Sequence, residues 1–268
     1  MISTFPYPGK KTKILKHILP LIPDHKKYIE PFAGGLAVFL SKEKSKFEVI
    51  NDLDLDITIF YRCVRYHKNA LLKELENYFH NRKEFENLVN MHPVTELQRA
   101  SRFYVTQCSS FGGHGRNWGR SSDGSSGFDY NKANYNIDKL SDRLRGVYIE
   151  NNDFEDIIKT YAKNPNKEKN PNEDTFIYCD PPYLTGKIYK YKSFKKDDMI
   201  RLKDCLEKTN AKWLLSCDGS KDCKDIFKDH YIKQIDIIYN IGNKLGKSSK
   251  EFLVMSDSLS QNVSELVF

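Results

Sequence analysis

Residues 175–183 read Thr-Phe-Ile-Tyr-Cys-Asp-Pro-Pro-Tyr, an apolar run that ends in an acid, two prolines and a tyrosine. The run predicts a buried strand, and the prolines predict a rigid turn at its carboxyl end. In an open α/β sheet this end of a strand faces the ligand crevice. Asp180 and the Pro181 carbonyl then offer two acceptors for one amino group, and Tyr183 offers a ring for stacking. The set suits the exocyclic amine of a nucleobase, and the alternative is an ordinary turn with a buried tyrosine.

Strand and helix patterns alternate on both sides of this stretch. Apolar spacing predicts a helix over 12–22, disturbed near its end by Pro20. A second helix is predicted over 197–208, beginning at an acidic cap formed by Asp197 or Asp198. Predicted strands include KYIE, FEVIND, VYIE, TFIYC and KWLLSCD, with YIKQIDIIYN and EFLVMS as a late antiparallel pair. This alternation predicts an α/β fold with a doubly wound sheet.

The middle of the chain breaks the alternation. Helical patterns cover 58–90 and 95–107, and the Gly-, Ser- and Asn-rich residues 111–136 are expected to form no ordinary core element. We therefore expect a catalytic domain made of residues 1–58 and 145–268. The inserted residues 59–144 are expected to form a separate, mainly helical domain.

Composition narrows the class of protein and points to a location for a partner. The 268 residues are 39% hydrophobic, which excludes wholesale disorder. Apolar runs of transmembrane length, signal-peptide features and zinc-type cysteine spacing are absent from the sequence, so we expect a cytosolic protein with reduced thiols. The net charge is +7, and residues 59–144 carry +4 of it. A basic insertion in an otherwise near-neutral α/β chain favours nucleic acid as the partner.

Four further short motifs each carry a weaker signal. Residues 30–35, Glu-Pro-Phe-Ala-Gly-Gly, predict a tight turn that permits close approach to a ligand. Asn51-Asp52 follows a strand, where an acid can accept hydrogen bonds from a ribose. The pair Asp153-Phe154 places an acid and an aromatic ring side by side, which suits an adenine. Residues 7–11, Tyr-Pro-Gly-Lys-Lys, include a lysine suited to neutralising a ligand carboxylate. Each motif alone also fits an ordinary turn or helix cap.

The order of these motifs resembles the Dam-like DNA adenine-N6 methyltransferases, the alpha group or D12 class. In that family a YxGxK element precedes a PFxGG element, a target-recognition insertion follows, and a DPPY element comes after it. The matching stretches here are residues 7–11, 31–35 and 180–183. The resemblance covers nearly the whole chain. Pro8 departs from it, because relatives often have a small polar residue there.

The resemblance implies a Rossmann-like methyltransferase sheet with a reversed last strand, S-adenosylmethionine as cofactor, and no metal. The methionine end of the cofactor would be held by Tyr7 and Lys11, and its ribose by Asp52. The remaining cofactor residues would be Phe32, Ala33 and Gly34 in the pocket, Asp153 and Phe154 at the adenine, and Asp180. The catalytic residues would be Asp180, Pro181, Pro182 and Tyr183, acting on an adenine flipped out of duplex DNA.

Two segments are expected to contact double-stranded DNA. Phe111 and Arg116 match the spacing of an aromatic residue and an arginine in the family's recognition region; Arg116 would read guanine, and Phe111 or Trp118 would wedge or stack. Residues 186–196 place five lysines among three aromatic residues and would contact phosphates. The alternatives are phosphate contact by the first segment and solvated loops. The full predicted set is Phe111, Arg116, Asn117, Trp118, Arg120, Lys187, Lys190 and Lys192.

Together these observations predict a site-specific, adenine-specific DNA methyltransferase of bacterial or phage origin. We expect a monomer in the cytoplasm, with any cognate restriction endonuclease acting separately. The alternatives are methylation of cytosine N4, of RNA or of a protein amide, or a catalytically idle DNA-binding relative.

Overall fold

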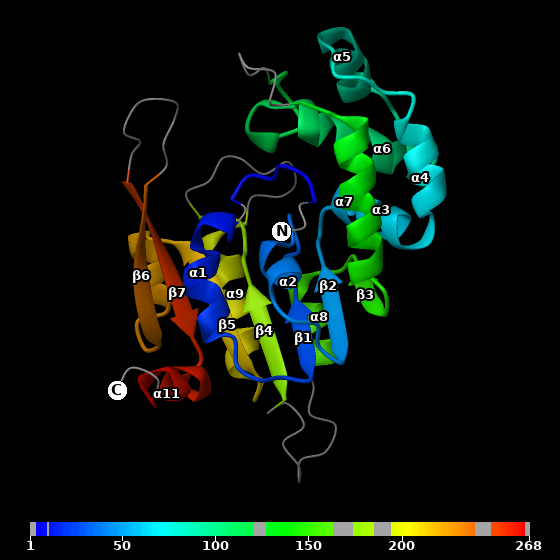
Figure 1. Ribbon diagram of the computed structural model, residues 1–268. Helices are drawn as coiled ribbons and strands as arrows, with labels where there is room; N and C mark the ends of the chain where they lie inside the picture. Colours follow the sequence, from blue (N-terminus) through cyan, green and yellow to red (C-terminus); the bar gives the residue numbers. More distant parts are fainter. Residues whose placement is uncertain are drawn as a thin grey trace. The chain divides into compact units, whose positions relative to one another are not determined.

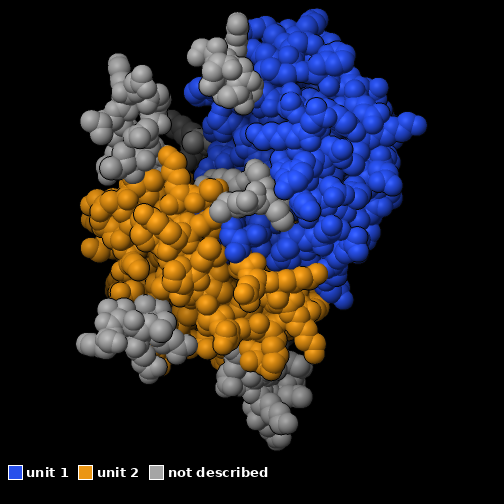
Figure 2. All heavy atoms as spheres, in the orientation of Figure 1, with its two compact units in different colours: residues 1–11, 34–41, 52–151 blue, residues 12–33, 42–51, 152–268 orange. Residues whose placement is uncertain are grey.

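The computed structural model describes residues 4–9, 11–119, 127–162, 174–184, 194–238 and 248–265. The chain separates into two compact units, coloured in Figure 2. Unit 1 contains residues 1–11, 34–41 and 52–151, and unit 2 contains residues 12–33, 42–51 and 152–268. The chain therefore changes unit inside the glycine turn and again between Asn51 and Asp52.

The parallel strands of unit 2 are β1 (Lys27–Glu30), β2 (Phe47–Asn51), β4 (Thr175–Cys179) and β5 (Lys212–Asp218). Strand β7 (Ser248–Met255) runs antiparallel to both β5 and β6 (Tyr231–Ile238). With β3 (Val147–Glu150) of unit 1, the seven strands follow the order β3-β2-β1-β4-β5-β7-β6. This confirms the predicted α/β class, the reversed last strand and the late antiparallel pair.

Helices cover both faces of the unit 2 sheet. Figure 1 shows α8 (Phe154–Tyr161) and α9 (Lys196–Glu207) behind it and α1 (Leu15–Ile18) in front. Every residue of β4 is buried, as expected for a strand covered on both sides. Alternate strand residues such as Ile177 and Cys179 share one core cluster with the apolar faces of α8, α9 and α10 (Lys221–Ile226). Helix α11 (Asp257–Glu265) follows the last strand.

The predicted helix over 12–22 is present as three short pieces. A 3-10 turn covers Lys11–Ile14, α1 follows, and a second 3-10 turn covers Leu19–Leu21. Pro20 lies in the last turn, where its missing N–H and its ring prevent a regular α-helix from continuing.

Unit 1 is mainly helical. Its helices are α2 (Ala37–Ser41), α3 (Leu55–Tyr66), α4 (Lys68–Leu75), α5 (Arg82–Asn90), α6 (Glu96–Ser109) and α7 (Tyr130–Arg143). Helix α3 packs on α6 and α7. At this junction the rings of Phe60 and Tyr104 stack with centroids 5.2 Å apart. The helical patterns predicted over 58–90 and 95–107 are confirmed.

One prediction about the glycine-rich stretch was wrong. Residues 111–136 were expected to form no core element, yet α7 begins at Tyr130. Asp129 caps this helix by accepting the backbone N–H of Lys132 at 2.7 Å, and Ala133 is buried. The composition of the stretch does not reveal the helix, because Asn131, Lys132 and Asn134 are exposed while Ala133 and Asn136 are buried.

The predicted acidic cap of the helix over 197–208 was also wrong. Helix α9 begins at Lys196, and Lys195 occupies the N-cap position. Asp198 lies at the third helical position, where its carboxylate accepts the Lys195 N–H at 2.9 Å. The acid therefore stabilises the helix start from inside the first turn.

The six cysteines are free thiols, and five of them are buried, as predicted. Among the described residues, the helices are too short or too polar to cross a bilayer.

Candidate functional site

Strand β4 delivers Asp180 to its carboxyl end, where a neighbouring strand fixes the side chain. The hydroxyl of Ser216, in β5, donates to Asp180 Oδ1 at 3.0 Å. Ser216 is fully buried, and its oxygen also lies 2.9 Å from the hydroxyl of Tyr178. Burial, followed by the charge of Asp180, raises the pKa of Tyr178 well above its ordinary value. Tyr178 therefore remains a neutral hydrogen-bonding group beneath the carboxylate.

The tyrosine of the same turn is held from a third strand. The Tyr183 hydroxyl donates to Oε1 of Glu251, in β7. Glu251 is 2% exposed, so the acceptor is a buried carboxylate. The prolines restrain the backbone before Tyr183, and Glu251 holds the far end of its side chain. Sequence reasoning missed Ser216 and Glu251, because they are 36 and 68 residues from their partners and belong to no local motif.

The end of β2 joins two loops of unit 2. Asn51 donates through Nδ2 to the carbonyls of Pro31 and Asn152, at 2.9 and 3.0 Å. Its Oδ1 accepts the Asn152 N–H at 2.9 Å. The Asn51 carbonyl also accepts the N–H of buried Ala33 at 2.7 Å. One residue therefore fixes both the loop that carries Phe32 and the loop that leads into α8.

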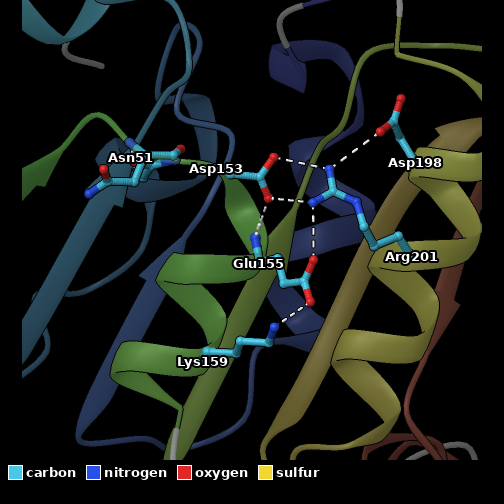
Figure 3. A network of polar contacts seen from close by, with 7 residues as sticks. Asn51, Asp153, Glu155, Lys159, Asp198 and Arg201 are labelled. Atoms are coloured by element: carbon cyan, nitrogen blue, oxygen red, sulfur yellow. Dashed lines mark hydrogen bonds and ion pairs between the residues drawn. The ribbon is translucent and has the colours of Figure 1, made fainter.

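The predicted adenine-binding residues lie together in unit 2. Asp153 caps α8 by accepting the Glu155 N–H at 2.9 Å. The rings of Phe32 and Phe154 have centroids 5.5 Å apart. Figure 3 shows that Arg201, on α9, reaches Asp153 with a paired contact. Arg201 was absent from the sequence prediction, because only the fold brings α9 to the start of α8.

The predicted cofactor residues of unit 1 form a second group around Gly34. Gly34 has a φ of +42°, and its N–H donates to Asp52 Oδ2 at 2.8 Å. A Cβ at Gly34 would lie 3.0 Å from the ring of Tyr7, so glycine permits this close approach. The hydroxyl of Tyr61, in α3, donates to the Gly34 carbonyl at 2.6 Å. The structure therefore brings Tyr7, Gly34 and Asp52 into direct contact within unit 1.

Two ionisable groups of this unit are partly or wholly removed from solvent. Burial raises the pKa of Asp52 to about 7, although backbone N–H groups, including those of Asp54 and Gly34, oppose the shift. Lys11 is buried, and its Nζ donates to the carbonyl of Gly9 at 3.0 Å. A buried ammonium at this place suits an anionic ligand group such as a carboxylate.

In the predicted recognition loop of unit 1, some side chains are exposed and others pack against neighbouring residues. Phe111 is 71% exposed, and Arg116 and Asn117 are exposed beside it. The Phe111 N–H donates to the Asn117 carbonyl at 2.8 Å, which closes the loop. Trp118 instead stacks on His80, with centroids 4.3 Å apart and planes 17° from parallel. The predicted DNA contacts Arg120, Lys187, Lys190 and Lys192 lie outside the described residues.

The parallel sheet with its reversed strand, together with the Asp-Pro-Pro-Tyr turn, is typical of methyltransferases that act on amino groups, and comparison with known proteins gives the family. The profile of the D12 class N6 adenine-specific DNA methyltransferases matches residues 7–241. The type II methyltransferase M1.LlaDCHI of Lactococcus lactis subsp. cremoris is 25% identical over 264 residues, covering 90% of each chain. The type II methyltransferase M.CviBI of Paramecium bursaria Chlorella virus NC1A is 27% identical over 232 residues, covering 84% of this chain and 85% of the relative.

A DNA adenine methylase of Vibrio cholerae is 24% identical over 220 residues, covering 75% of this chain and 74% of the relative. The chain belongs to the D12 class N6 adenine-specific DNA methyltransferases. The family resemblance inferred from the ordered motifs is therefore confirmed.

Proposed function

We propose that this chain transfers a methyl group from S-adenosylmethionine to N6 of an adenine flipped out of double-stranded DNA. The observation that carries the proposal is the braced Asp-Pro-Pro-Tyr turn, in which Ser216 holds Asp180 and Glu251 holds Tyr183. These contacts fix one carboxylate and one ring at the carboxyl end of β4, where ligands of open α/β sheets bind.

The acceptors of the turn explain how a poor nucleophile is activated. The lone pair of an adenine N6 amine is delocalised into the ring. Asp180 and the Pro181 carbonyl accept its two N–H bonds, which favours a pyramidal nitrogen with its lone pair directed at the methyl group. Because Ser216 and the prolines fix both acceptors beforehand, the polar groups need little reorganisation during the reaction. Tyr183 stacks on the flipped base, since an adenine inside the duplex is out of reach.

Each unit contains residues whose chemistry suits one part of S-adenosylmethionine. In unit 1, Gly34 permits the close approach of Tyr7, Asp52 suits the ribose hydroxyls, and buried Lys11 suits the carboxylate. In unit 2, Asp153 and Phe154 suit the adenine. When bound, S-adenosylmethionine supplies an activated methyl group.

The DNA contacts that we propose for unit 1 are the exposed side chains of its predicted recognition loop. Exposed Phe111 is the better wedge, because Trp118 is stacked on His80. Arg116 is exposed and has the fork that reads guanine. We assign residues 59–144 to target recognition, and 1–58 with 145–268 to catalysis. We further propose a monomer that acts on cellular or phage DNA in the cytoplasm, separately from any cognate endonuclease.

The test is transfer of a labelled methyl group from S-adenosylmethionine to duplex DNA, followed by mass spectrometry of the nucleosides. We expect N6-methyladenine, with Asp180→Ala slower by about 100- to 1000-fold. Asp229→Ala, at an exposed position after α10, is the control and should match wild type. Label found as N4-methylcytosine, label on RNA alone, or full activity in Asp180→Ala would each refute the proposal.

A further inference from the structure

One arginine of α9 gathers three carboxylates from two helices. Arg201 Nη1 donates to Asp153 Oδ1 at 2.8 Å and to Glu155 Oε2 at 3.0 Å. Its Nη2 donates to Asp153 Oδ2 at 3.0 Å and to Asp198 Oδ1 at 3.3 Å. The two parallel contacts with Asp153 form a bidentate pair, whose geometry is visible in Figure 3.

The same guanidinium also covers the next residue in the chain. Arg201 Cζ lies 4.3 Å from the centroid of the Phe154 ring, within the range of a cation–π contact. Phe154 is buried, and Phe32 packs against it at 5.5 Å. A single side chain therefore fixes both the plane of the Asp153 carboxylate and one face of the Phe154 ring.

The cluster is accessible to a ligand. The side chains of Arg201 and Asp153 are 39% and 34% exposed, so the carboxylate that the arginine fixes can still be reached from solvent. Three carboxylates surround one guanidinium, with Lys159 pairing only with Glu155 among the described residues. The three carboxylates outnumber the two cations, so charge balance does not explain the cluster. The contacts instead fix the orientation of the Arg201 guanidinium.

The acceptor sites of Asp153 can be counted. A carboxylate offers about four lone-pair sites. Within the described part of the chain, Oδ1 accepts from the Glu155 N–H and Arg201 Nη1, and Oδ2 accepts from Arg201 Nη2. One site therefore remains on Oδ2, and the bidentate pair fixes its direction.

We propose that Arg201 is a positioning residue for the adenine of the cofactor. It would hold Asp153 so that Oδ2 accepts the exocyclic amine of the adenine, and it would fix the Phe154 ring beside that carboxylate. The proposal rests on the proposed function, because it requires that an adenosyl compound bind at Asp153 and Phe154. Lysine cannot substitute, because a point charge lacks the fork that fixes a carboxylate plane.

The test compares two ligands that differ at the amine: S-adenosylhomocysteine and S-inosylhomocysteine, which carries an oxygen in place of the amino group. Their dissociation constants are measured by calorimetry for wild type, Arg201→Lys and Arg201→Gln. Lys203→Ala is the control, since it removes an ion pair with Glu207 from the same helix. We expect wild type and the control to favour the adenosyl ligand. Both Arg201 variants should bind it about 10-fold more weakly and lose most of the preference.

A merely structural Arg201 would weaken both ligands equally, so an unchanged preference in the two variants overturns the proposal. Wild type that binds both ligands alike overturns it too, while leaving the proposed function intact. Wild type that binds neither ligand overturns the proposed function as well.

Discussion

Replacing Gly34 by alanine tests whether the turn after β1 is shaped for a cofactor. The φ of +42° is a left-handed conformation, which costs a non-glycine residue about 1–2 kcal/mol. The new Cβ would lie 3.0 and 3.3 Å from two ring carbons of Tyr7, so the ring must retreat by a few tenths of an ångström. The same residue donates to Asp52 at 2.8 Å, so two proposed cofactor contacts move together. We expect S-adenosylmethionine to bind about 10- to 100-fold more weakly, equivalent to about 1.4–2.8 kcal/mol.

Gly146 provides a matched control for this variant. It has a φ of +77°, and a Cβ built there meets nothing within 4 Å. Gly146→Ala therefore carries a similar backbone cost without a steric one, and both variants should lose about 1–2 kcal/mol of unfolding free energy in a denaturant titration. Calorimetric titration with S-adenosylmethionine should separate them. If Gly34→Ala bound the cofactor within twofold of Gly146→Ala, the contact with Tyr7 would have no part in the site.

Three further predictions concern a titration, a hydrogen bond and an ion pair. Because the pKa of Asp52 is raised to about 7 in the fold from an ordinary 3.8, the folded state binds its proton more tightly than the unfolded chain; this stabilising contribution should decline as pH rises between those values, and Asp52→Asn should remove that slope from denaturation curves. S-adenosylmethionine should bind more tightly at pH 8 than at pH 6, since the ionised carboxylate is the stronger acceptor, and a flat profile would contradict this role. Glu251→Gln should slow single-turnover methyl transfer about 10-fold with cofactor affinity unchanged, because Tyr183 loses a charge-assisted bond; an unaltered rate would show that the bond does not position the ring. Asp56→Ala should cost about 3 kcal/mol of unfolding free energy, because buried Asp56 accepts from Arg102 at 3.0 Å, and a loss below about 0.5 kcal/mol would show that the pair is dispensable.

The fold class was predictable because its signals are local. The run that precedes Asp180 is uniformly apolar and becomes a strand buried on both faces. The antiparallel pair at the end of the sheet is predicted by two apolar runs that follow each other closely in the sequence. In the glycine-rich stretch, where the prediction was wrong, contacts between helices outweighed composition: Ala133 and Ile137 are buried because other helices of unit 1 cover that face of α7.

The candidate site was predictable only as far as its motifs extend along the chain. Motif residues such as Asp153 and Asp180 could be named, but the groups that brace them could not. Ser216, Glu251 and Arg201 lie 36, 68 and 48 residues from their partners, and no periodicity or spacing links positions so far apart. These groups can be identified once the sheet order places β5 beside β4 and β7 beside β5, and once α9 packs on α8.

The N-terminal segment shows how two of the proposed roles share one stretch of backbone inside unit 1. Phe5 is buried, with its ring 4.9 Å from that of Phe103 in α6, so the helical core anchors the segment. The next residue, Pro6, meets the recognition loop so closely that a Cβ at Gly113 would lie 2.5 Å from its carbonyl oxygen. Tyr7, one peptide bond further, packs on Gly34. Glycine is thus required at the contacts of two consecutive residues, Gly113 against Pro6 and Gly34 against Tyr7, so the recognition loop and the proposed cofactor turn meet the chain one residue apart. The packing units and the proposed domains therefore divide the chain at different places, because Tyr7 belongs to catalysis by its proposed role and to the helical unit by its contacts.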